Sequence, residues 1–290
     1  MRRSLACISG GLHLAAPVVM DHVSAQDIIS EARQVAMRKA SLSTGQMLLR
    51  GALAGGILAY ATSLAMVIIS QGVVPIVAAL CFPVGFVMLV LLGLELATGN
   101  FALMPVGYSA GAVRLNDVWR NWTWVYIGNL IGSVAYAALF AVAITNFGGS
   151  NGGPLGDQLR KVAEAKTVGY MSAGLGGWAA ALVKGILCNW MVTIGALLAL
   201  ASRSTIGKIA AMWLPIATFF AHGFEHSIVN MFVVPAGMFL GAPVSMSAWW
   251  VWNQVPVTLG NLVGGVFLTG AALSLAYPQR PTSVAQIPAA

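Results

Sequence analysis

Two acidic side chains and one histidine lie inside apolar stretches of the sequence, where ionisable residues are uncommon. Glu95 and Glu225 interrupt two of these stretches, and His226 directly follows Glu225. An ionisable residue within a membrane-spanning stretch is a candidate functional residue, and histidine changes its charge near physiological pH. We interpret His226 as a group that gives a hydrogen bond or a proton to a weak-acid anion. The alternative is a structural histidine that stabilises a break in a helix.

The two glutamates occupy equivalent positions of a repeated motif. Gly, Glu, Asn, Pro and Gly recur at identical spacing in two segments, Gly93-Leu-Glu95-Leu-Ala-Thr-Gly-Asn100-Phe-Ala-Leu-Met-Pro105-Val-Gly107 and Gly223-Phe-Glu225-His-Ser-Ile-Val-Asn230-Met-Phe-Val-Val-Pro235-Ala-Gly237. We expect helix breaks at 98–100 and 227–230. Because buried polar groups must be paired, we interpret Glu95, Asn100, Glu225 and Asn230 as structural residues that bond to the backbone freed by these breaks. A proton or cation path through the glutamates is the alternative.

Three further polar residues are candidates for binding a substrate together with His226. Thr98 offers a hydroxyl at the first break, and we expect it to face His226. Asn189 and Lys184 lie in another apolar stretch. The lysine either attracts anions or extends its amine towards a membrane surface.

Four phenylalanines near these polar residues are candidates for apolar gates. They are Phe82, Phe86, Phe219 and Phe220. Ordinary helix packing is the alternative for each of them, because aromatic side chains are frequent in packed cores.

The composition indicates that membrane helices position these residues. Hydrophobic residues make up 58% of the 290 positions and charged residues 8%, whereas soluble domains carry about 25% charged residues. The apolar runs are continuous, which favours helices of about 20 residues over the alternating strands of a barrel. We predict an all-α polytopic membrane protein with a polar loop at 145–167 and six spans, at residues 51–70, 74–113, 122–144, 173–201, 209–240 and 249–277.

The repeat extends beyond the two glutamate motifs. Gly56-Ile57-Leu58 in the first span corresponds to Gly185-Ile186-Leu187 in the fourth, and Gly128-Asn129 in the third corresponds to Gly260-Asn261 in the sixth. Because each half contains three spans, the second half enters the membrane in the opposite direction. We therefore predict an inverted 3+3 repeat with broken helices 2 and 5, a class that places its permeation site between the breaks.

The charge distribution orients the spans. The net charge is +7, and the basic residues gather near the ends of the apolar runs. The positive-inside rule therefore places both termini in the cytoplasm. Membrane topology also accounts for the positive charge, so we expect no nucleic-acid partner. We predict a multi-pass protein of the cell (inner) membrane with three parts, which are a cytoplasmic segment 1–48, a channel domain 49–280 and a cytoplasmic tail 281–290.

The N-terminal segment contains two distinct stretches. Residues 1–20 resemble a weak signal peptide without a cleavage site, and Met20 is an alternative start. Within residues 21–50, Ile28, Ala32 and Val35 share one face of a predicted amphipathic helix at the membrane surface.

The motifs resemble those of the formate/nitrite transporter family. The resemblance rests on Gly223-Phe-Glu-His-Ser-Ile-Val-Asn-Met-Phe232, Lys184-Gly-Ile-Leu-Cys-Asn-Trp190 and Glu95-Leu-Ala-Thr-Gly-Asn100, and it covers about residues 30–280. It implies homopentamers of aquaporin-like protomers in the lipid bilayer, each with its own pore for a small anion such as formate, nitrite or hydrosulfide, with protons as a second species.

The resemblance also implies roles for individual residues. His226 matches the central pore histidine, Thr98 the threonine of the first break, and Asn189 the asparagine of span four. Phe82 and Phe219 match the aromatic constriction. Ala97 stands where the family usually has a bulky residue in the constriction. The family's lysine before span four aligns near Ala173, so Lys166 or Lys184 would have to replace it.

Other classes of function fit the residues less well. An aquaporin-like pore for a neutral solute is the alternative to an anion channel, but neither Asn100 nor Asn230 begins an Asn-Pro-Ala sequence. An enzyme is not expected, because no motif pairs a nucleophile with a base or cradles a phosphate. The spacing of Cys7, Cys81 and Cys188 predicts neither a disulfide framework nor a metal site, and we expect no cofactor.

Overall fold

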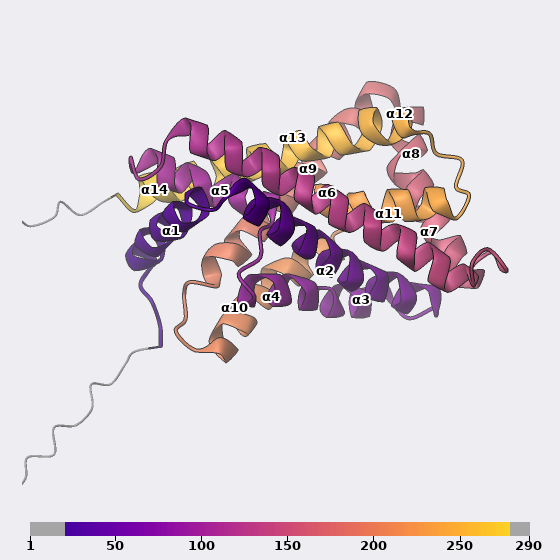
Figure 1. Cartoon of the computed structure of the whole chain (residues 1–290), viewed down its shortest axis with the longest axis horizontal. Coiled ribbons are helices and arrows are strands. Elements are labelled where there is room, and N and C mark those ends of the chain that lie inside the picture. Colours follow the sequence, from indigo (N-terminus) through magenta and orange to yellow (C-terminus); the bar gives the residue numbers. More distant parts are fainter. Residues whose placement is uncertain (1–20, 279–290) are drawn as a thin grey trace, which may run out of the picture.

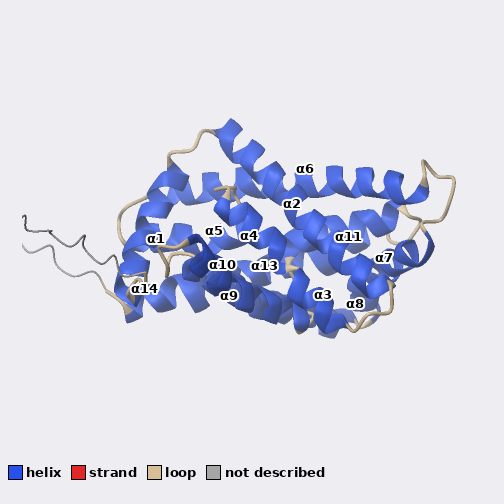
Figure 2. Ribbon diagram, turned by 90° about the horizontal axis from the view of Figure 1, so that it is seen from below, coloured by secondary structure: helices blue, strands red, loops and turns tan. Residues whose placement is uncertain are grey.

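The computed structural model describes residues 21–278, and every regular element in that range is a helix (Figures 1 and 2). The first twenty residues and the predicted tail 281–290 lie outside the described residues. Four helical stretches are long and apolar enough to cross a membrane, and three shorter apolar stretches accompany them. The protein is therefore an all-helical membrane protein with several apolar spans.

The first half of the described chain contains six helices. A short amphipathic helix comes first, a long apolar helix follows, and three shorter helices lead to a second long helix. In chain order they are α1 (Ala25–Ala40), α2 (Thr44–Ser70), α3 (Pro75–Cys81), α4 (Pro83–Leu91), α5 (Ala97–Ser109) and α6 (Leu115–Thr145). Pro75 and Pro83 begin α3 and α4, positions where a missing N–H costs no helical hydrogen bond.

The second half has the same order of amphipathic, long, interrupted and long helices. These are α7 (Gly153–Lys166), α8 (Val168–Ser172), α9 (Gly174–Leu198), α10 (Thr205–Ala221), α11 (Ser227–Phe239), and a last stretch made of α12 (Met246–Trp249), η1 (Trp250–Gln254), α13 (Val255–Val263), η2 (Gly264–Ala271) and α14 (Ala272–Ala276). The segments η1 and η2 are π-helical.

The two interruptions lie a few residues before the positions expected from the sequence. The chain leaves α4 at residues 92–96 and α10 at residues 222–226, so residues 98–100 and 227–230 form the first turns of α5 and α11. Gly93 and Gly223 adopt φ values of 64° and 65°, which only glycine tolerates readily. These left-handed residues end α4 and α10, and the turn-like appearance of Thr98-Gly99-Asn100 was misleading.

Close approach of glycines joins the long helices in pairs. A Cβ atom added to Gly51 of α2 would lie 3.2 Å from the Cα of Gly128 in α6. One added to Gly185 of α9 would lie 3.2 Å from the Cα of Gly260 in α13. Gly185 is therefore the structural equivalent of Gly51, which corrects the sequence alignment of Gly185 with Gly56. Small residues at such crossings allow the backbones to touch, which is how membrane helices associate tightly.

The predicted polar loop at 145–167 contains a helix. Within it, α7 packs against α11 as α1 packs against α5. A Cβ added to Gly107 would meet the Cβ of Ala36 on α1, and one added to Gly237 would meet that of Ala163 on α7. The loop prediction was wrong because the helix is amphipathic and covered by protein on one face, so its average composition is polar.

The N-terminal helix α1 also packs on protein, whereas the sequence suggested a helix at the membrane surface. Ile29 and Ala32 are buried against Leu103 and Val106 of α5 and Leu197 of α9. Both ends of the described chain lie at this end of the molecule (Figure 1), where the amide of Gln26 donates to the carbonyl of Pro278.

Candidate functional site

The N-terminal ends of α5 and α11 meet at a buried contact between a threonine and a histidine. Thr98 Oγ1 lies 3.1 Å from His226 Nε2, and both residues are buried. This is the proximity that the sequence predicted for the two side chains. Because both helices begin here, their positive dipole ends are directed towards the same region.

The backbone of α11 fixes the hydrogen position on the His226 ring. The N–H groups of Ile228 and Val229 both donate to His226 Nδ1, each over 3.2 Å. A ring nitrogen that accepts carries no hydrogen, so the neutral imidazole holds its hydrogen on Nε2. The Nε2–H group therefore donates to Thr98, and it is the group available to a ligand.

Asn189 connects this contact to the last helical stretch. Its amide nitrogen donates to the carbonyl of Thr98 over 3.1 Å and to that of Asn261 over 2.6 Å. Its carbonyl oxygen is buried and has no hydrogen-bond partner among residues 21–278. Asn189 therefore positions the first turn of α5 and leaves one acceptor unused.

Two asparagines outside the predicted site, Asn129 and Asn261, hold the breaks. Asn129 Oδ1 accepts from the N–H of Ala97, and its Nδ2 donates to the carbonyls of Gly51 and Glu95. Asn261 makes the same three bonds with Ser227, Gly185 and Glu225. The matching Gly-Asn pairs in the third and sixth spans were the available signal for this role.

The glutamates bind side chains, which corrects the expectation that they bond to freed backbone. Glu95 pairs with Lys39 over 2.9 Å, and Glu225 pairs with Lys166 over 2.7 Å. Asn100 and Asn230 also donate to these carboxylates, over 2.8 and 2.7 Å. A buried carboxylate needs a cation more than it needs another neutral donor, and each amphipathic helix supplies one.

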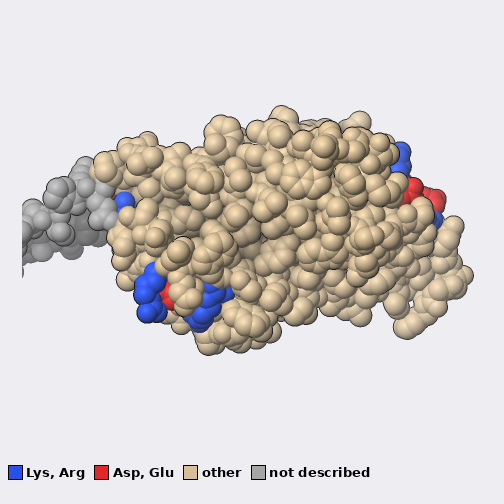
Figure 3. Space-filling view, turned by 90° about the horizontal axis from the view of Figure 1, so that it is seen from above, with Lys and Arg blue, Asp and Glu red and all other residues tan. Residues whose placement is uncertain are grey.

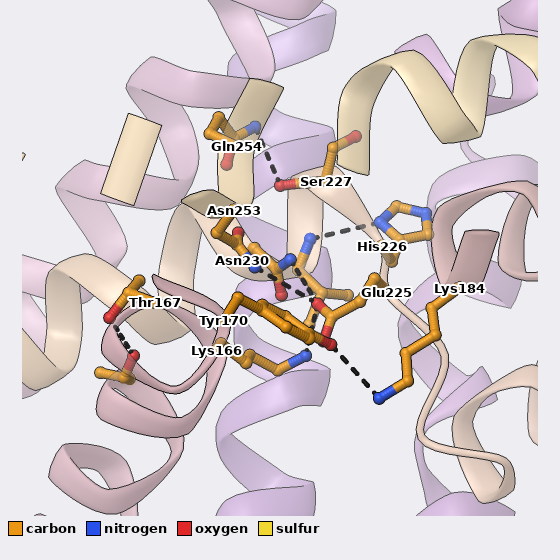
Figure 4. A network of polar contacts seen from close by, with 12 residues as sticks. Lys166, Thr167, Tyr170, Lys184, Glu225, His226, Ser227, Asn230, Asn253 and Gln254 are labelled. Carbon is orange, nitrogen blue, oxygen red and sulfur yellow. Dashed lines mark hydrogen bonds and ion pairs between the residues drawn. The ribbon is translucent and has the colours of Figure 1, made fainter. Parts of the chain in front are cut away.

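Lys184 lies beside Tyr170, in a hydrogen-bond network that includes Glu225. Its amine donates to the Tyr170 hydroxyl over 3.3 Å, and that hydroxyl donates to Glu225 over 2.8 Å (Figure 4). Burial and the negative charge of Glu225 raise the pKa of the Tyr170 phenol, which keeps it a donor. Of the two lysines considered as replacements before span four, Lys166 reaches the glutamate.

The phenylalanines that the sequence predicts to form an aromatic constriction lie next to the histidine. The Phe82 and Phe219 rings meet edge to face with centroids 5.7 Å apart, and Phe220 stacks on Phe82 at 4.2 Å. Phe219 also stacks on His226 at 5.7 Å. Phe86 is buried in the same core, and Ala97 is buried at the start of α5.

Two cavities flank this centre. The α1 cavity has a volume of about 390 Å³ and is lined by Lys39, Gly93, Leu94 and Glu95 of the first break region, together with further basic residues. The α7 cavity has a volume of about 240 Å³ and is lined by Lys166, Phe219, Gly223 and His226. Ala97 is not among the residues that line either cavity.

These features define a class of protein. Interrupted helices that meet at their N-termini around a buried polar contact, with a cavity on either side, are the architecture of a helical membrane transport protein. The family described as formate/nitrite transporter matches residues 26–275. The chain therefore belongs to the formate/nitrite transporter family, whose members are channels and not enzymes.

Individual relatives resemble the chain over most of its length. A probable formate transporter of Methanothermobacter thermautotrophicus is 35% identical over 88% of this chain and 97% of the relative. The formate channel FocA of Escherichia coli strain K12 is 30% identical over 71% of this chain and 75% of the channel.

Two solved structures resemble the fold. An FNT family ion channel superposes with a TM-score of 0.75 at 28% identity, over 87% of this chain and 99% of that one. A pentameric formate channel with formate bound superposes with a TM-score of 0.66 at 27% identity, over 81% and 98%.

Proposed function

We propose that the chain is a channel or transporter for small monovalent anions of weak acids, of the formate, nitrite or hydrosulfide class. The observation that carries the proposal is the 3.1 Å contact of His226 with Thr98. It presents an N–H donor between two helix N-termini, beside a cavity and an aromatic constriction. A small anion is the ligand that such converging donors and dipoles favour.

The geometry suggests how an anion passes the constriction. An anion in the α7 cavity replaces the Thr98 hydroxyl as the acceptor of the His226 Nε2–H group. The phenylalanine rings exclude water there, and an unpaired charge in an apolar region costs several kcal/mol or more. The hydrogen bond offsets part of this cost, and uptake of a proton by the anion, which converts it into the neutral acid, removes the charge altogether. Transport is therefore passive or coupled to protons.

We also propose the membrane topology. The six spans are α2, α3 to α5, α6, α9, α10 to α11, and α12 to α14, arranged as an aquaporin-like inverted 3+3 repeat in the cell (inner) membrane. The equivalent bonds of Asn129 and Asn261 and of Glu95 and Glu225 support the repeat. With both termini in the cytoplasm, the α1 cavity is cytoplasmic and the α7 cavity is external. A homopentamer is proposed by analogy with the pentameric formate channel.

Flux measurements test the function directly. Proteoliposomes with wild-type protein are expected to transport formate, nitrite or hydrosulfide above background, with a rate that depends on pH. His226→Ala is expected to reduce the rate by about tenfold or more, because a hydrogen bond to a charged group contributes about 1.5–3 kcal/mol. His22→Ala, which changes an exposed histidine, is the control. Unchanged flux and pH dependence in His226→Ala would refute the role of the histidine.

A further inference from the structure

The α1 cavity concentrates positive charge. Four of its lining residues are basic (Arg38, Lys39, Arg50 and Lys208), and its one acidic lining residue is Glu95. Lys39 pairs with Glu95 over 2.9 Å. Three basic side chains therefore remain around a cavity of about 390 Å³.

No carboxylate side chain neutralises these three residues. Within residues 21–278, the structure gives no ion pair for Arg38, Arg50 or Lys208. The remaining segments, 1–20 and 279–290, contain no aspartate or glutamate in the sequence. Most acids of the chain already have partners, as in the pairs of Arg203 with Glu31, Arg114 with Asp117, Arg160 with Asp157 and Lys166 with Glu225.

The α7 cavity lacks this excess. Its one basic lining residue is Lys166, which pairs with Glu225. Arg50 and Lys184 are equivalent in the repeat, since the carbonyl of each accepts the N–H of the neighbouring glutamate, over 3.5 and 3.4 Å. Their side chains differ in environment, because Lys184 is bound to Tyr170 and Arg50 lines the α1 cavity. The excess charge therefore belongs to one side of the protein.

We propose that the α1 cavity binds a multivalent oxyanion of the phosphate class, which blocks substrate flux from that side. A monovalent substrate offsets one of the three positive charges, whereas a dianion offsets two. The guanidinium groups of Arg38 and Arg50 match the oxygen geometry of a tetrahedral oxyanion, and Lys208 adds a point charge. A volume of about 390 Å³ accommodates such an ion with part of its water.

The bound dianion cannot continue through the centre. The cost of removing an ion from water rises with the square of its charge, so the apolar contact of Phe82 with Phe219 excludes a dianion far more strongly than a monovalent anion. The ion therefore occupies the cavity and leaves by the same side. Binding stands independently of the proposed function, whereas the block rests on it.

Binding is measured by calorimetry on the full-length protein in detergent, with sulfate and phosphate as probes and chloride as the monovalent control. Lys208→Gln is expected to weaken sulfate binding about tenfold, from the Coulomb energy of a unit charge and a dianion at about 6 Å in water. Lys161→Gln, an equal change of charge on the exposed face of α7, is expected to leave binding unchanged. Absence of sulfate binding, or equal weakening by both variants, overturns the proposal.

Lipid headgroups carry the same phosphate chemistry, so binding is repeated in nanodiscs. If sulfate binds more weakly in nanodiscs of anionic lipid than in nanodiscs of zwitterionic lipid, the anionic headgroups compete for the site, and the site is assigned to a headgroup. Equal affinity assigns it to a soluble ion. Absence of sulfate binding in both kinds of disc overturns the proposal.

Sided flux separates this proposal from the proposed function. Sulfate on the cytoplasmic side is expected to reduce formate flux at matched ionic strength, whereas sulfate on the outside is expected to have no effect. The Lys208→Gln variant is expected to need about tenfold more cytoplasmic sulfate for the same inhibition. Equal inhibition from both sides overturns the block. If the wild-type protein binds sulfate but transports none of the anions, the proposed transport function is refuted and the oxyanion site in the α1 cavity is not.

Discussion

The ion pair between Lys166 and Glu225 offers a quantitative test of how the breaks are stabilised. The pair is 2.7 Å long, with side-chain exposures of 21% and 3%. Breaking a buried pair by removing one partner costs about 3–5 kcal/mol, because the other charge stays buried. In Lys166→Met, Glu225 retains Tyr170 and Asn230 as hydrogen-bond donors. We therefore expect this variant to lower the free energy of unfolding by about 3 kcal/mol, the lower end of that range.

The other variants of the cycle follow from the same contacts. Glu225→Gln is expected to cost about 2 kcal/mol, because the Lys166 amine is more accessible to water. The double variant removes both charges and is expected to cost about 1–2 kcal/mol, which gives a coupling energy of about 3–4 kcal/mol. Reversible unfolding in mixed detergent micelles measures each free energy.

The control cycle uses Lys161→Met and Glu164→Gln, which lie on the same helix and for which the structure gives no ion pair. We expect their effects to add within about 0.5 kcal/mol. If the double variant of Lys166 and Glu225 costs as much as the sum of its single variants, the pair is not coupled and the reasoning is refuted.

Three further predictions address the centre and the N-terminal segment. Thr98→Val removes the hydroxyl that accepts from the His226 Nε2–H group and that is free to donate to an anion once the anion has replaced it as the acceptor. This variant is expected to reduce formate flux about fivefold to tenfold, whereas Thr98→Ser retains most of it. Asn129→Ala and Asn261→Ala each remove three hydrogen bonds, and unfolding in micelles is expected to show a loss of about 2–4 kcal/mol for each. Donation by the Ser202 hydroxyl and neighbouring N–H groups lowers the pKa of the Asp21 carboxyl below 3.8, so its stabilising contribution is present at neutral pH and disappears as the pH falls through the lowered pKa. The protection of the Arg203 and Ser204 amides against exchange, relative to their intrinsic rates, is then expected to fall at acid pH.

Each of these predictions has an outcome that contradicts it. Equal flux in Thr98→Val and wild type would show that the hydroxyl is not needed at the centre. An effect confined to one of the two asparagines would show that the breaks are not stabilised equivalently. The Asp21→Asn variant has no charge to lose. In this variant, the protection of amides 203–204 against exchange should respond to acid pH in the same way as that of other exposed amides. An unchanged acid response would contradict the assignment to Asp21.

The glutamate motifs made much of the centre predictable. Gly93 and Gly223 stand at equal positions in the repeat, and they end α4 and α10 in the structure. The same alignment placed Thr98 and His226 on opposite sides of one centre, where they are 3.1 Å apart. Local sequence located the breaks only to within a few residues, because Gly99 looks like a turn residue but lies in the first turn of α5.

The sequence by itself determined that this chain is a membrane protein, that its halves repeat, and which acids and histidine are buried. Charge scarcity, apolar run length and repeated spacing are local properties that can be read along the chain. Only the tertiary structure decided what those residues bind, because their partners are distant in sequence and periodicity indicates burial but not the neighbour across an interface. Lys39 reaches Glu95 and Lys166 reaches Glu225 through helices that pack on α5 and α11. Basic side chains gather near the end of the molecule where the described chain begins (Figure 3). The same packing leaves Arg38, Arg50 and Lys208 around one cavity. No single segment of the sequence contains this arrangement of charge.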